Sequence, residues 1–177
     1  MNKWRIAITW SVVIVLVSSL YNEMLIVLES ESIWLALVGL VIFSLGLYLA
    51  MKRYRDKSQG GYASFGNIYQ FGILMSLPML PLIIAHRFIS NAIHTQYLQA
   101  IIDAKKAALI TQGVTESQME MGMRISAFFG SNPVGIVIAS ILGTVLTVVL
   151  LGLIPAGILN KPRPFMMEDE DNNIPQA

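Results

Sequence analysis

The two histidines of this 177-residue chain, His86 and His94, are the side chains best suited to metal or acid–base chemistry. Metal-binding pairs on one helix usually lie four residues apart. The separation of eight residues seen here turns the two rings about 80° from each other and more than two helical turns apart. No carboxylate lies between them in the sequence. We therefore interpret both as polar residues where a membrane span ends, and expect neither a metal ion nor a cofactor.

Other catalytic side-chain patterns are missing from the sequence. It contains no cysteine, which excludes disulfides, thiolate metal ligands and cysteine nucleophiles. It has no serine triad, phosphate-binding loop, dinucleotide-binding fingerprint or pair of catalytic carboxylates. A net charge of +1 gives no reason to expect nucleic acid as a partner. These absences favour a protein that is not an enzyme.

Two prolines, Pro78 and Pro81, lie in the middle of an apolar stretch at about 67–89. Each removes a backbone donor and crowds the preceding turn, so together they predict a kinked helix. Broken helices build the binding sites of many transporters. An ion pathway usually carries an ionisable residue, however, and none accompanies this break. The pair therefore favours a structural kink.

Small residues recur every four positions in two of the apolar stretches. They are Gly135, Ala139, Gly143 and Thr147 in the last stretch and, as a weaker pattern, Gly46 and Ala50 in the second. Such residues let helix backbones approach closely in lipid, where packing drives association. They predict helix contacts, either within the chain or between copies of it.

Long apolar stretches explain the unusual composition. The chain is 55% hydrophobic and only 13% charged, whereas soluble domains carry about 25% charged residues. A membrane-spanning helix needs about 20 apolar residues, and four stretches qualify, at about 4–25, 33–51, 67–89 and 133–159. We predict an all-α integral membrane protein with four transmembrane helices that form a single membrane domain over 1–160.

The positive charges predict the orientation of the spans, because basic loops stay in the cytoplasm. With both termini inside, eight of the 12 Lys and Arg residues are cytoplasmic and four are outside. The first outer loop then carries acidic charge only. The sequence therefore predicts cytoplasmic N- and C-termini.

The segment at about 90–131, outside the membrane, predicts an amphipathic helical hairpin. Apolar residues recur every fourth position from Ile89 to Ile101, so the third span should continue as one helix to about Gln112. Thr115 and Gln118 have the spacing of a capping box that starts a second helix.

Two segments expected in the cytoplasm have sequence patterns that predict their local structure. Gly60 and Gly61 permit positive φ, so the inner loop can turn sharply back to the membrane, with Ser64 capping the third helix. The tail at 161–177 contains prolines and an acidic run, and we predict that it is disordered.

The chain resembles a family of small four-helix membrane proteins of unknown function, common in Bacteroidota. The resemblance covers about 39–162 and implies a bacterial membrane protein, but it supplies no catalytic or binding residue. It rests on Tyr54-Arg55-Asp56, Gly60-Gly61, Ser64-Phe65-Gly66, the methionines Met119, Met121 and Met123, and Asn160-Lys161-Pro162.

Together these features predict a non-enzymatic subunit of the bacterial inner membrane with an accessory, assembly or scaffold role based on helix–helix contacts. Its expected partners are the lipid bilayer and either another membrane protein or a second copy of the chain. One alternative is a small solute or ion transporter or channel that uses the kinked third span. A weaker alternative is a lipid-modifying enzyme with His86 near the outer headgroups.

Overall fold

The computed structural model describes residues 2–28, 32–111 and 115–162, and every element named in these ranges is an α-helix. Four of the helices, the first three and the last, are long and apolar enough to cross a membrane. The helices are α1 (Lys3–Val27), α2 (Ile33–Ser58), α3 (Phe65–Ile93), α4 (Thr95–Thr111), α5 (Glu116–Ser131) and α6 (Pro133–Leu159).

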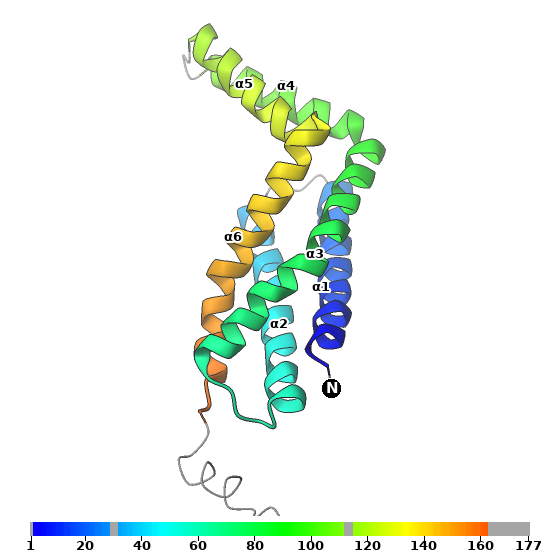
Figure 1. Ribbon diagram of the computed structural model, residues 1–177. Helices are drawn as coiled ribbons and strands as arrows, with labels where there is room; N and C mark the ends of the chain where they lie inside the picture. The colour runs from blue at the N-terminus through cyan, green and yellow to red at the C-terminus, as the bar shows by residue number, and fades with distance from the viewer. Residues whose placement is uncertain (1, 29–31, 112–114, 163–177) are drawn as a thin grey trace, which may run out of the picture.

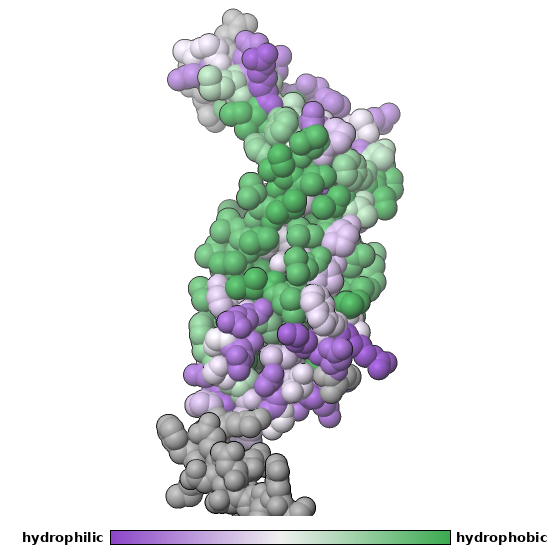
Figure 2. Space-filling model, viewed as in Figure 1, coloured by the Kyte–Doolittle hydropathy of each residue, from purple (hydrophilic) through white to green (hydrophobic). Residues whose placement is uncertain are grey.

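The four long helices form a bundle with two distinct ends (Figure 1). At one end, here called the base, α1 begins and α6 ends; at the other, the apex, α4 and α5 extend beyond the bundle. Figure 2 shows an apolar band across the visible face, with hydrophilic residues gathered at both ends. Lipid accommodates a surface with this layering, because the hydrocarbon core lies between two polar layers.

The core of the bundle lies toward the base. The buried residues of α1 run from Ile6 to Val15, those of α2 from Leu47 to Tyr54, and those of α3 from Ile68 to Met79. Each set therefore occupies the base half of its helix, while α6 has buried residues along its whole length. Side chains pack tightly at the base, and the apex halves of three helices have no buried residues of their own.

The third helix bends partway along its length (Figure 1), and Pro78 and Pro81 lie inside it. Protein groups satisfy carbonyl oxygens just before the prolines. The Ser76 hydroxyl donates to the Ile73 carbonyl at 2.7 Å, and the buried Ser11 hydroxyl of α1 donates to the Met75 carbonyl at 3.1 Å. Neither of these acceptors is the Leu74 or Leu77 carbonyl, from which the prolines remove the usual N–H donor, so these two bonds brace the neighbouring turn.

The chain at the apex forms two helices where periodicity indicated one, because α3 ends at Ile93 and α4 begins at Thr95. The Thr95 hydroxyl donates to the Asn91 carbonyl at 2.8 Å, which satisfies an acceptor that the end of α3 leaves free. Gln112, the predicted end of this helix, lies outside the described residues.

The second apical helix, α5, begins next to Thr115 as predicted. The Thr115 hydroxyl, however, bonds the Gln118 side chain at 2.9 Å and caps no backbone N–H. A hydrogen bond of 2.8 Å from the Asn91 amide to the Gly130 carbonyl joins α3 to α5. The pairing of α4 with α5 as a hairpin stays a prediction.

Candidate functional site

At the base, the loop between α2 and α3 is tied to the chain that leaves α6. Ala63 and Lys161 exchange two backbone hydrogen bonds of 2.9 Å each. The side-chain oxygen of Asn160 accepts from the Phe65 backbone N–H at 3.0 Å, so a residue after α6 satisfies a free donor at the start of α3. We call this set of contacts, together with those of Arg55 below, the base clasp.

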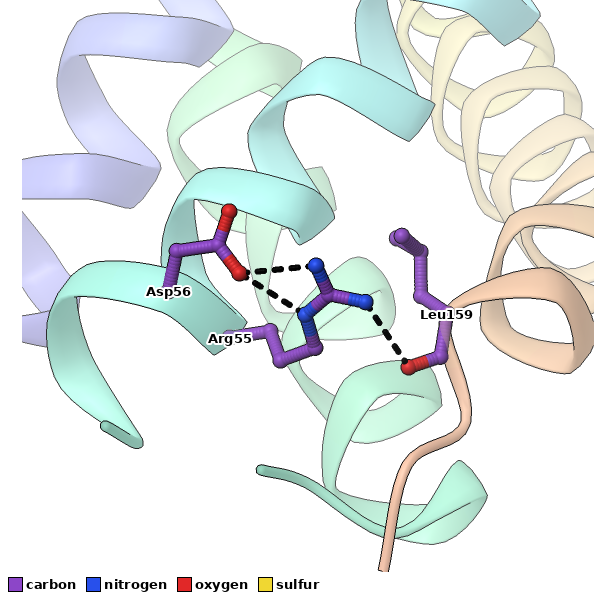
Figure 3. Close-up of polar contacts among 3 residues, drawn as sticks. All are labelled: Arg55, Asp56 and Leu159. Atoms are coloured by element: carbon purple, nitrogen blue, oxygen red, sulfur yellow. Dashed lines mark hydrogen bonds and ion pairs between the residues drawn. The ribbon is translucent and has the colours of Figure 1, made fainter. Parts of the chain in front are cut away.

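The guanidinium of Arg55 completes the base clasp (Figure 3). Its Nε and Nη2 atoms each lie 2.8 Å from Oδ1 of Asp56. Its Nη1 atom donates to the carbonyl of Leu159 at 3.5 Å. Leu159 is the last residue of α6, so Arg55 places a positive charge where the helix dipole and a free carbonyl favour one. Residue Arg55 thereby links the end of α2 to the end of α6.

The loop can close in this way because two glycines turn it. Gly60 and Gly61 have φ values of 65° and 88°, a conformation that other residues rarely adopt. Ser64 then caps α3 by accepting from the Asn67 N–H at 3.4 Å. The tyrosine before Arg55, Tyr54, stacks on Phe71 with ring centroids 4.1 Å apart. Most of the motifs on which the family resemblance rests thus meet at the base, where they hold the fold together.

The apex half of the bundle contains a partly open cavity of about 720 Å³ between α1, α2, α3 and α6, bordered by α4 and α5. This apical cavity has the size of small-molecule binding sites, which are about 300–1,000 Å³. Most of its wall is apolar, as in such sites. The apolar lining includes Val15, Leu25, Ile26, Leu40, Phe43 and Ile83.

The small-residue pattern of α6 divides between two roles. Gly135 lies directly against the backbone of Phe128 in α5, so a side chain there would collide with another helix. Gly143 and Thr147 instead line the apical cavity, and a Cβ atom added to Gly143 would meet nothing within 4 Å. Ala139 is partly buried. Within this chain, Gly143 therefore leaves space open and brings no second helix close.

In α2, the weaker pattern lies on the packed side of the bundle. Gly46 is directly against the side chain of Ile14 in α1, and Ala50 is fully buried. Both positions allow α2 to approach its neighbours closely.

The two histidines are brought together by Glu23 of α1. Its Oε2 atom lies 2.7 Å from His94 Nε2, and its Oε1 atom lies 3.6 Å from His86 Nε2. No carboxylate lies between the histidines in the sequence, but in the fold a carboxylate from another helix stands between them. In the part of the chain that the structure describes, no three acidic, histidine or cysteine side chains are arranged to hold a metal ion.

Spacing along the helix that carries the histidines does not reveal this contact, because its carboxylate comes from another helix. Glu23 and His94 are 71 positions apart in the sequence. A signal was available, since the first and third of successive spans run in the same direction and bring their C-terminal ends to the same side. The contact joins the apical ends of α1 and α3.

Two polar groups that line the apical cavity lack partners. The hydroxyl of Ser18 is buried and makes no hydrogen bond within the described residues. The guanidinium of Arg87 likewise has no hydrogen bond or ion pair with the described part of the chain. A buried hydroxyl left unpaired costs about 1–3 kcal/mol. The Ser18 oxygen is covered by protein atoms, whereas Arg87 is exposed and can bond a molecule that enters the cavity.

Comparison with known proteins gives one match. The family model described as "Protein of unknown function (DUF4199)" matches residues 6–161, a range that includes both the base clasp and the apical cavity. No curated protein and no solved structure matches the chain.

Proposed function

We propose that the chain, which belongs to the DUF4199 family of proteins of unknown function, is a non-enzymatic multi-pass membrane protein that binds a membrane-resident amphiphile in its apical cavity. The observation that carries this proposal is the open volume of about 720 Å³ at the apex. The cavity is partly open and its wall is mostly apolar, so in a membrane an apolar group must fill it, and an amphiphile of the bilayer is suited to do so.

The charges of the base support its placement in the cytoplasm. The base carries Lys3 and Arg5 at the start of α1, the basic end of α2, and Lys161 after α6. Basic residues beside membrane spans stay on the cytoplasmic side. The cavity then lies in the outer half of the bacterial inner membrane, where an amphiphile can enter from the outer leaflet.

Binding is better supported than transport across the membrane. Below the cavity, Met51, Met75 and Met79 are fully buried, and the base clasp joins α2, α3 and α6 at the cytoplasmic end. The prolines of α3 lie beside this packed core, where Ser11 of α1 bonds the Met75 carbonyl of α3. A transported molecule would have to separate these contacts, whereas a bound one need only occupy the cavity.

An accessory role follows from such binding. A protein that holds one amphiphile without changing it can present it to a partner or use it to complete its own helix packing. The exposed apolar residues of α2, among them Trp34, Leu37 and Val41, offer a surface for a partner helix. In this role the protein would contact its partner by helix–helix packing on that surface.

The test is ligand retention after purification in mild detergent, measured by native mass spectrometry. Wild type should carry a bound amphiphile. Gly143→Leu should lose it, because the added side chain projects into the cavity and meets no protein atom within 4 Å at its Cβ. Gly157→Leu is the matched control: it lies on the same helix, also meets open space, does not line the cavity, and should keep the ligand. Equal retention in wild type and Gly143→Leu would rule the proposal out.

A further inference from the structure

We propose that the ligand of the apical cavity is an anionic amphiphile whose carboxylate or phosphate binds Arg87 and whose acyl chain lies against the apolar wall. This inference rests on the proposed function and adds the chemical class of the ligand. It is carried by the position of Arg87 on the cavity wall and by the charges around it.

The charge of the cavity wall is positive. Arg87 lines the cavity, and none of the described residues that line it is Asp or Glu. The nearby carboxylate of Glu23 does not line the cavity; it is hydrogen-bonded to His94 and lies 3.6 Å from His86. Arg87 is itself exposed, so its guanidinium stands at the rim of the cavity and is free to meet a charged headgroup. Its planar fork matches the paired oxygens of a carboxylate or phosphate.

The geometry places this charge at the correct level for a headgroup. Arg87 lies between Ile83 and Asn91, one turn away from each on α3, and all three line the cavity. Asn91 is itself fixed to α5 by its hydrogen bond to the Gly130 carbonyl. Arg87 is thus in the last two turns of α3, toward the apical surface.

The depth of the cavity matches an acyl chain of one leaflet. On α6 the lining runs from Ile136 to Thr147, a rise of roughly 16 Å at 1.5 Å per residue. Half of the hydrocarbon core is about 15 Å thick.

Two sources could supply this chemistry, a free fatty acid and an anionic phospholipid, and their masses separate them. The full chain is reconstituted in vesicles of equal phosphatidylcholine and phosphatidylglycerol with added oleate, and then analysed by native mass spectrometry. Wild type should retain phosphatidylglycerol or oleate about tenfold over phosphatidylcholine, because all three offer acceptor oxygens to Arg87 but only phosphatidylcholine also carries a choline cation, which the guanidinium repels. Wild type that retained phosphatidylcholine equally well would overturn the inference.

Substitutions assign the preference to Arg87. Arg87→Gln should reduce the anionic preference about tenfold while amphiphile is still retained, and Arg87→Lys should keep part of it because the charge remains. Arg124→Gln is the matched control, since Arg124 is exposed on α5 and does not line the cavity; it should behave as wild type. An unchanged preference in Arg87→Gln would reject the anionic class and leave cavity binding standing. Retention of every amphiphile by Gly143→Leu would instead reject cavity binding itself.

Discussion

The base and the apex use the same four helices in opposite ways. At the base, the buried side chains interlock, and the chain segments that leave the helices bond to one another through the base clasp. At the apex, the helix ends are joined by a few polar contacts, such as that of Glu23 with His94, and enclose open volume. The base therefore holds the bundle together, and this leaves the apex free to bind a ligand.

The contrast also shows where family motifs can mislead. The glycine pair, the Tyr-Arg-Asp run and the Asn-Lys-Pro run meet at the base, where their donors and acceptors satisfy one another. They stabilise the fold and leave little for a ligand to bind. The unpaired groups of the cavity, Arg87 and Ser18, belong to none of these motifs.

The largest expected difference between the two ends is in the free energy of unfolding lost when one phenylalanine at each end is replaced. Phe71 at the base is buried and stacked on Tyr54, so Phe71→Ala should lower the free energy of unfolding by about 3 kcal/mol through lost packing. Phe43 lines the apical cavity and is only partly buried, so Phe43→Ala should cost about 1 kcal/mol. Denaturant unfolding in detergent measures both. Equal losses would mean that the two ends are packed alike.

A smaller effect is expected for the base clasp. Arg55→Ala removes the bonds to Asp56 and to the Leu159 carbonyl, and should cost about 1 kcal/mol. Arg55→Lys should recover only part, because a lysine cannot bond both groups in a fixed fork. Arg53→Ala, at an exposed neighbouring position, should stay within about 0.5 kcal/mol of wild type. If Arg53→Ala destabilised the protein as much as Arg55→Ala, the stability would depend on the general basic charge of this segment and not on the bonds of the base clasp.

The sequence predicted the elements better than it predicted the site. Continuous apolar runs identify helices of spanning length. Ser64, the predicted cap of α3, accepts from the Asn67 N–H at 3.4 Å. The contact between Glu23 and the histidines depends on how α1 lies beside α3, which no local pattern encodes. The cavity depends on volume that side chains leave empty, and periodicity cannot distinguish a small residue at a helix contact from one beside a void. Gly135 and Gly143 share one pattern and differ in this respect.

The central claim, an open apex above a packed base, is tested most directly by thiol labelling along α6. The chain has no native cysteine, so single cysteines can be introduced at Gly143, which lines the cavity, and at Ala156, which is fully buried at the base. The labelling rate with N-ethylmaleimide is measured in detergent, with and without added oleate. We expect Gly143→Cys to label fast and oleate to slow this labelling. Ala156→Cys should label little in either condition. Equal rates at the two positions, or labelling of Gly143→Cys that oleate leaves unchanged, would contradict it.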